Sequence, residues 1–288
     1  MQRSGLSSLV PAKSANLDGI NINYASTKLI PEELTLVLIH GYGSSLETWH
    51  DVYPSLAARF QAVRLDLKGH GFSSKPDDKN YTLEDQARLV ISFIKSLALK
   101  RVVLAGHSLG GGVALLVYFL SQLSNAPFTI SKIILINSVG YPQQFPFFVR
   151  SISHPVTRFL VYRIPARIRA YILLNNIFVV KRKITADRIF RYSYFFDLPG
   201  SHNALEQTAK FIVPQNINEL TSQFKDISVP TLIIWGANDN VVPIENAHRF
   251  ERDIKRSKLV LIPETGHVPH EERPDHVLGE LFDFIKSD

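Results

Sequence analysis

The chain contains no cysteine, and this absence removes several kinds of chemistry at once. Thiol nucleophiles, thiolate metal sites, iron–sulfur clusters and disulfide frameworks are all excluded. The chain also lacks any run of the roughly 18 apolar residues that a membrane-spanning helix needs. Its first residues hold only a short, interrupted apolar run, which does not match the core of a signal peptide. We therefore expect a cytoplasmic protein.

The composition is that of an ordinary globular protein, with 45% hydrophobic and 20% charged residues. No internal repeat or low-complexity tract interrupts it. A length of 288 residues suffices for one large domain, or for a core domain that carries an insertion.

Short apolar runs alternate with segments of helical periodicity over most of the chain, which predicts the α/β class: a mostly parallel central sheet wrapped by helices. The stretch 102–112 combines a buried strand with the start of a helix. The other expected strands are 18–25, near a sheet edge, 34–39, 62–66, 132–137, 229–235 and 258–262, and the other expected helices are about 46–59, 82–97, 244–254 and 274–285.

The alternation stops between about residues 140 and 225. This segment shows helical spacing in 157–162, 166–174 and 185–194. We interpret residues 140–225 as a helical cap inserted into a core domain that comprises 1–139 and 226–288.

The cap also carries the basic charge of the chain. Between Arg150 and Asp197 there are ten Lys and Arg against two Asp, a net +8 that exceeds the +6 of the whole chain. This concentration argues against a nucleic-acid-binding surface spread over the protein. We interpret the charges as solvated outer faces of cap helices whose aromatic side chains face inward. Weak contact with an anionic membrane surface, or with an acidic substrate, stays open as an alternative.

The pattern Gly106-His107-Ser108-Leu109-Gly110 lies where the strand of 102–112 passes into its helix. A G-x-S-x-G sequence in this context forms a tight turn that exposes the serine hydroxyl at its tip. Glycines two residues to either side let the neighbouring backbone approach closely. We therefore expect Ser108 to be a nucleophile held in a strained backbone conformation.

A serine hydroxyl needs a base that takes its proton and a carboxylate that orients this base. His267 follows the strand at 258–262 and Asp239 follows the strand at 229–235, so both are predicted at the carboxyl edge of the sheet, with Ser108. The end of the strand at 132–137 offers no carboxylate, only Asn137 and Ser138. The other histidines fall inside predicted helices, in the cap or in turns near the nucleophile.

The attacked carbonyl becomes an oxyanion, which needs hydrogen-bond donors that are already in place. The backbone N–H of Leu109, in the first turn of a helix, is one candidate. The backbone N–H of Tyr42, in the loop His40-Gly41-Tyr42-Gly43, is the other. This chemistry requires neither a cofactor nor a metal ion, and we expect none.

Together the motifs H-G-Y-G, D-L-K-G-H-G-F-S, G-H-S-L-G-G-G, W-G-A-N-D and G-H-V-P-H resemble the α/β-hydrolase fold superfamily in order and separation. The resemblance covers about residues 18–286 apart from the cap. It implies Ser108 as nucleophile, Asp239 as acid, His267 as base, and the amides of Tyr42 and Leu109 as oxyanion hole. The stretch 66–73 is similar to a structural turn of the family.

The motifs are less specific for the substrate. The Gly-His-Ser-x-Gly-Gly form favours a carboxylic ester hydrolase of the esterase and lipase type, acting on a small molecule. Hydrolases of meta-cleavage products, which break carbon–carbon bonds, are the first alternative, and Arg188 or Arg191 would then bind a substrate carboxylate. Here, however, His107 and Val268 replace residues typical of that group. Cofactor-free perhydrolases share the triad, and a ligand receptor that retains it is a further alternative. An apolar acyl pocket is expected from Phe145, Phe147, Phe148, Phe159, Phe195 and Phe196.

Overall fold

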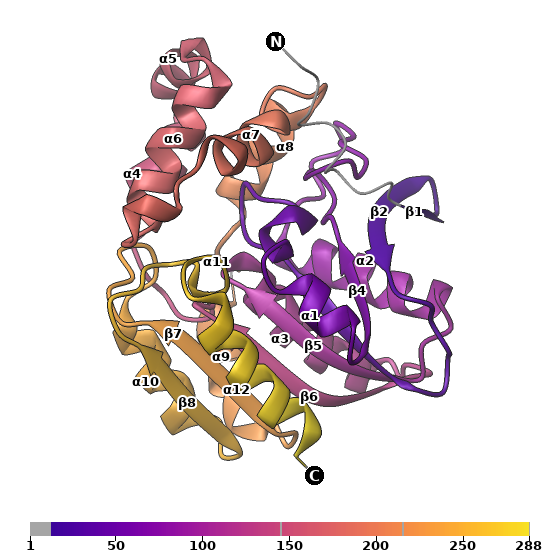
Figure 1. Cartoon of the computed structure of the whole chain (residues 1–288). Coiled ribbons are helices and arrows are strands. Elements are labelled where there is room, and N and C mark those ends of the chain that lie inside the picture. Colours follow the sequence, from indigo (N-terminus) through magenta and orange to yellow (C-terminus); the bar gives the residue numbers. More distant parts are fainter. Residues whose placement is uncertain (1–12, 145, 215, 288) are drawn as a thin grey trace.

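The computed structural model describes residues 13–144, 146–214 and 216–287 (Figure 1). Its centre is an eight-stranded sheet with the order β1-β2-β4-β3-β5-β6-β7-β8. The strands are β1 (Lys13–Leu17), β2 (Ile20–Ser26), β3 (Leu34–Ile39), β4 (Gln61–Leu65), β5 (Arg101–His107), β6 (Thr129–Ile136), β7 (Thr231–Gly236) and β8 (Ser257–Ile262).

Strands β3 to β8 pair in parallel, whereas β2 pairs antiparallel with both β1 and β4. The predicted fold class is therefore confirmed. The carboxyl ends of β5, β6 and β7 are aligned by direct pairing, for example His107 with Ile136. Residues that follow these strands consequently meet at one edge of the sheet.

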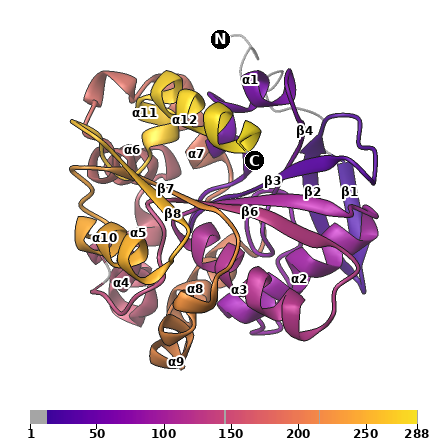
Figure 2. The ribbon, with the colours of Figure 1, turned by 90° about the horizontal axis from the view of Figure 1, so that it is seen from below.

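Helices cover both faces of the sheet (Figure 2). On one face lie α2 (Leu83–Ser96), α3 (Leu109–Leu123) and α10 (Ile244–Asp253), and on the other lie α1 (Tyr53–Ala57) and α12 (Pro274–Lys286). Each face has its own cluster of buried aliphatic and aromatic side chains, because the central strands are apolar on both sides. A short helix, α11 (Pro269–Glu272), precedes α12.

The helix expected over 46–59 is two separate pieces, and that expectation was wrong. A single 3₁₀ turn covers Leu46–Trp49, and α1 begins only at Tyr53. Pro54 explains the break, because proline has no N–H to donate and is tolerated only in the first turn of a helix. The helix expected over 82–97 is α2, which begins with a full capping box between Thr82 and Asp85.

The chain between β6 and β7 is helical. It forms α4 (Phe147–Ser153), α5 (Pro155–Arg163), α6 (Ala166–Ile177), α7 (Ala186–Tyr194), α8 (Ser201–Lys210) and α9 (Ile217–Ser222). Figure 1 shows α4 to α7 above the carboxyl ends of the strands, with α5 at the outer tip. The three stretches of predicted helical spacing lie in α5, α6 and α7. Within the described ranges, no helix combines the length and the apolar character needed to cross a membrane.

Candidate active site

Ser108 alone forms the turn between β5 and α3, and its backbone is strained. Its φ is +52° and its ψ is −118°, a conformation that a residue with a side chain rarely adopts. Such a residue costs on the order of 1–3 kcal/mol. The turn is this tight because the flanking glycines allow it: a Cβ on Gly106 would lie 2.2 Å from the carbonyl oxygen of Gly110.

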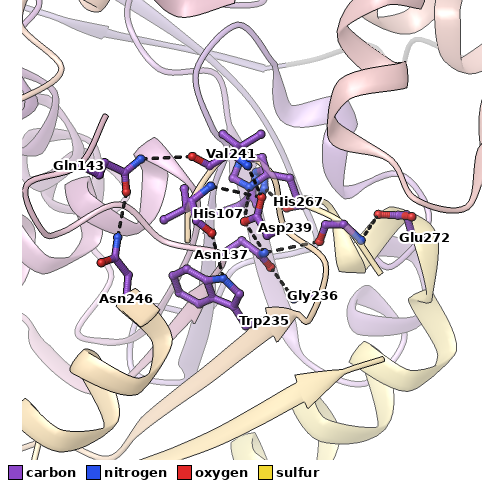
Figure 3. Close-up of polar contacts among 12 residues, drawn as sticks. His107, Asn137, Gln143, Trp235, Gly236, Asp239, Val241, Asn246, His267 and Glu272 are labelled. Carbon is purple, nitrogen blue, oxygen red and sulfur yellow. Dashed lines mark hydrogen bonds and ion pairs between the residues drawn. The ribbon is translucent and has the colours of Figure 1, made fainter. Parts of the chain in front are cut away.

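His267 and Asp239 are joined by a hydrogen bond of 2.8 Å between His267 Nδ1 and Asp239 Oδ2 (Figure 3). The side chain of Asp239 is fully buried. Because a carboxylate only accepts hydrogen bonds, Nδ1 carries the ring proton and the lone pair of Nε2 is free to accept another. The pair therefore has the arrangement required of a general base and its orienting acid.

Three further hydrogen bonds hold Asp239 in place, and one comes from a residue to which the sequence analysis gave no role (Figure 3). Asn137 Nδ2 donates to Asp239 Oδ2 at 2.7 Å, while Asn137 Oδ1 accepts from the backbone N–H of Gly236 at 3.2 Å. The backbone N–H groups of Val241 and Val242 donate to Oδ1 at 2.7 and 3.2 Å. Asn137 has no carboxylate, but its amide orients the one that follows the next strand.

Ser108, His267 and Tyr42 line one pocket of about 40 Å³, the catalytic pocket. Asp239 lies behind His267, and Leu109 follows Ser108 as the first residue of α3. Across the described residues, the Ser108 hydroxyl makes no hydrogen bond, and the backbone N–H groups of Tyr42 and Leu109 donate none. Hydrogen bonds of a nucleophile are often long before substrate binds, and free amides beside a nucleophile can receive an oxyanion.

A neutral histidine supports the loop that carries His267. The ring of His107 packs between those of His267 and His270, and His107 Nε2 lies 2.9 Å from the carbonyl oxygen of His267. Burial, followed by the charges of His270 and His267, holds the pKa of His107 well below 6.5. His107 therefore stays neutral and donates its Nε2 proton to that carbonyl.

Glu272 ties the same loop to the cap, a role that the sequence did not indicate. Its Oε1 accepts the backbone N–H of Gly266 at 2.7 Å, and its Oε2 accepts those of Val179 and Val180 at 2.8 and 2.7 Å. The backbone N–H of His267 in turn donates to the carbonyl of Ile177 at 2.8 Å. Burial raises the pKa of Glu272 above 4.5, against the effect of these hydrogen bonds. The sequence shows the pair Glu271-Glu272 soon after His267, but nothing in it tells which groups either carboxylate contacts.

The two cap arginines considered as substrate ligands are engaged elsewhere. Arg188 is buried and forms ion pairs with Asp51 and Glu271. The Glu271 carboxylate also accepts a hydrogen bond from the Thr48 hydroxyl. Arg191 pairs with Asp187, one turn earlier in α7. Neither arginine lines the catalytic pocket, and among the residues that the structure describes no Lys, Arg, Asp or Glu does so.

A second, larger cavity of about 240 Å³ adjoins the catalytic pocket and lies among the cap helices. The two share Tyr42, Phe148 and Leu173 in their linings. Of the six phenylalanines expected to form an acyl pocket, three line this cavity: Phe147, Phe148 and Phe196. Phe195 is buried beside α7, whereas Phe159 is 58% exposed. Phe145 lies outside the described residues.

The stretch 66–73 forms a tight structural turn outside the catalytic pocket. The buried Asp66 carboxylate accepts the backbone N–H groups of Leu46 and Phe72 at 2.7 and 2.9 Å. Gly71 has a φ of +51°, and a Cβ there would lie 2.1 Å from the carboxylate. His70 is buried, and burial lowers its pKa to about 4. It does not line the pocket of Ser108.

Comparison with known proteins relates most of the chain to hydrolases. A family model described as alpha/beta hydrolase fold matches residues 35–274. The hydrolase YugF of Bacillus subtilis is 30% identical over 96% of this chain and 98% of its own length. The 2-hydroxy-6-oxo-6-(2'-aminophenyl)hexa-2,4-dienoic acid hydrolase of Metapseudomonas resinovorans is 30% identical over 87% of this chain and 83% of its own. The crystal structure of a membrane phospholipase A superposes with a TM-score of 0.75 at 26% identity, covering 95% of this chain and 85% of that one.

Proposed function

Since the chain belongs to the alpha/beta hydrolase fold family, we propose that it is a serine hydrolase that cleaves carboxylic esters with a largely apolar acyl group. The observation that carries the proposal is the placement of a strained Ser108 in one pocket with His267, whose Nδ1 is bonded to the buried Asp239. Each of the three residues has the chemistry that acyl transfer demands of it.

In the proposed acylation step, Ser108 Oγ attacks the ester carbonyl while His267 Nε2 takes the hydroxyl proton. The carbonyl oxygen becomes an oxyanion and accepts hydrogen bonds from the free N–H groups of Tyr42 and Leu109, a contribution of roughly 2.7–4 kcal/mol for each donor. The imidazolium of His267 faces the Asp239 carboxylate. It returns the proton to the leaving alcohol as the carbon–oxygen bond breaks, which leaves an acyl group on Ser108.

Deacylation repeats these roles with water. His267 Nε2 takes a proton from the attacking water, the same two amides receive the oxyanion, and the proton returns to Ser108 Oγ as the acid departs. Glu272 and His107 take no part in proton transfer. They hold the backbone on either side of His267, so that Nε2 keeps its orientation through both steps.

The linings of the two cavities favour an apolar ester over an anionic substrate. The Metapseudomonas relative is named for a dienoic acid, which is anionic at neutral pH. In this chain the catalytic pocket offers no cationic side chain, and Arg169, which lines the larger cavity, pairs with Asp197. Carbon–carbon bond cleavage of such an acid is therefore the second candidate. The 30% sequence identity with the Metapseudomonas relative favours it, whereas the uncharged lining of the catalytic pocket does not.

A fluorophosphonate probe and a panel of nitrophenyl esters test the proposal. We expect Ser108 to be labelled, and we expect Ser108→Ala to lower kcat by roughly 10⁴-fold or more with the melting temperature retained. Absence of labelling and of turnover would instead indicate a protein that binds a ligand without cleaving it. Faster turnover of a vinylogous ring-fission diketo acid than of any ester would favour the carbon–carbon alternative.

A further inference from the structure

We propose that the outer face of the cap docks on an anionic lipid surface, and that an acyl chain passes from this surface to Ser108 through the larger cavity. The docking face comprises Phe147 on α4, Val156, Phe159 and Leu160 on α5, and Ile168, Tyr171 and Ile172 on α6. Docking itself does not depend on the proposed ester hydrolysis, whereas the route of the acyl chain rests on it.

The docking face concentrates exposed apolar side chains. Among the described residues, seven of the thirteen large hydrophobic side chains recorded as exposed belong to it. On α5 they occur at positions i, i+3 and i+4, so they form one stripe along the helix, and α5 has no buried residue at all. The expectation that the cap aromatics face inward was therefore wrong for Phe147, Phe159 and Tyr171, which are 69%, 58% and 52% exposed. Exposed patches of this kind mark interaction sites.

The charge around the docking face selects an anionic partner. Helices α4 to α6 contain five arginines and no Asp or Glu. Arg158 and Arg169 pair with acids from later in the cap, Glu206 and Asp197. The other three, Arg150, Arg163 and Arg167, are exposed and have no ion-pair partner within the described part of the chain. Arg163 and Arg167 lie over the rings of Phe159 and Phe190, which leaves their charges without a carboxylate. Apolar side chains flanked by exposed arginines without an ion-pair partner are the pattern of a helix that lies at a lipid interface.

A second copy of the chain suits this face less well. A two-fold contact would bury the same cationic face of both copies against each other, and the three helices supply no carboxylate to neutralise Arg150, Arg163 and Arg167. A lipid surface presents acyl chains and phosphate groups together, so it satisfies the apolar and the cationic side chains at the same time.

The larger cavity lies between the docking face and the catalytic pocket. Phe147 and Ile172 belong to the docking face and also line the cavity, so the cavity borders the surface that would meet the lipid. Tyr42, Phe148 and Leu173 form its boundary with the pocket of Ser108. In Figure 1, α4 to α6 project away from the sheet above this edge. We therefore place the route of an extracted acyl chain through this cavity, past the side chains of Tyr42, Phe148 and Leu173.

Sedimentation with lipid vesicles tests the docking on the full chain. The protein carries Ser108→Ala, so that no lipid is consumed. We expect binding to vesicles of phosphatidylcholine mixed with phosphatidylglycerol, and binding at least about tenfold weaker to phosphatidylcholine alone. The double variants Phe159→Asp/Leu160→Asp and Arg163→Glu/Arg167→Glu should each lower binding at least about tenfold.

Matched controls separate the docking face from general charge and hydrophobicity. Leu123→Asp alters a side chain that is 80% exposed at the far end of α3, and Lys100→Glu reverses an exposed charge outside the cap. Both controls should bind the mixed vesicles as the parent does. Unchanged binding by both double variants would overturn the proposal. So would a dimer in solution that Phe159→Asp/Leu160→Asp converts to monomer, because the face would then join two copies.

Activity measurements keep the docking apart from the proposed function. Without the Ser108 substitution, Phe159→Asp/Leu160→Asp should cleave a soluble short-chain nitrophenyl ester at the parent rate. The same variant should lose at least about tenfold in rate on a long-chain ester held in the mixed vesicles. Docking without turnover of any ester would refute the proposed function alone. Turnover of soluble esters without docking would refute this inference alone.

Discussion

Replacing Glu272 by glutamine tests whether the clamp on the His267 loop supports catalysis. The carboxylate accepts the backbone N–H of Gly266 with one oxygen and those of Val179 and Val180 with the other. Glutamine has only one oxygen, so it can satisfy the two cap amides or the amide of Gly266, but not both. We expect the oxygen to stay with the two cap amides, which leaves an NH₂ group facing the N–H of Gly266.

The loss of stability in Glu272→Gln follows from the hydrogen bonds that the substitution removes. A hydrogen bond to a charged group contributes about 1.5–3 kcal/mol, and the side chain of Glu272 is almost fully buried, so water cannot replace the missing acceptor. A loss of about 2 kcal/mol lowers the melting temperature of a 288-residue protein by about 3 °C. Because Gly266 directly precedes His267, displacement of this loop also moves the base, and we expect kcat for a soluble ester to fall about tenfold or more.

The matched control is Glu264→Gln. It removes a charge from the same loop at a side chain that is 85% exposed, and it should change neither property. Thermal unfolding and steady-state kinetics measure the two effects, with kcat and KM determined separately. A purely structural role would lower the melting temperature and leave kcat intact. A variant with unchanged kcat would therefore refute the reasoning, even if its stability were reduced.

Two further predictions concern stability. Gly106→Ala should destabilise the protein by about 3 kcal/mol or more, because its Cβ would meet the carbonyl oxygen of Gly110 at 2.2 Å. Gly279→Ala, in open space within α12, should instead stabilise the protein by about 0.5–1 kcal/mol. Thermal melts that show equal effects for the two variants would contradict this prediction. Burial lowers the pKa of His70 to about 4, so the unfolded state takes up a proton near pH 6.5 while the folded state does not, and stability falls as pH drops between these values. From pH 6.5 to 5 the loss of stability that His70 causes is about 2 kcal/mol. Urea unfolding should show that His70→Gln loses less stability than the parent over that range. Equal losses would refute the lowered pKa of His70 as the cause.

Local patterns in the sequence were sufficient for most of the framework. The apolar runs predicted β3 and β7 closely because a strand buried on both faces needs a continuous apolar stretch. The helix expected over 82–97 matches α2 to within one residue at each end. The same reasoning failed at Pro54, where helical periodicity continues on both sides of a residue that breaks the hydrogen-bond ladder. Strand β1 was not foreseen, because it has five residues of which only Leu17 is buried, and so short a stretch carries little periodic signal.

Contacts between distant segments needed the folded chain. Asn137 meets Asp239, 102 residues later, only because β6 and β7 pair in a particular register. No local pattern marked Glu272 as an acceptor for the amides of residues 179 and 180, nor Arg188 as an internal ion-pair partner of Glu271. Each of these contacts depends on how the cap sits on the core.

The sequence by itself determined the class of fold and the positions of Ser108, Asp239 and His267 relative to its strands, because periodicity and turn chemistry act over a few residues at a time. Only the tertiary structure decided which side chains surround that serine and which face solvent. It turned the cap arginines 188 and 191 into internal ion pairs and left Phe159 and Arg163 on the outer surface. Whether a side chain is buried depends on segments far away in the chain, and these come together only when the cap packs over the carboxyl edge of the sheet.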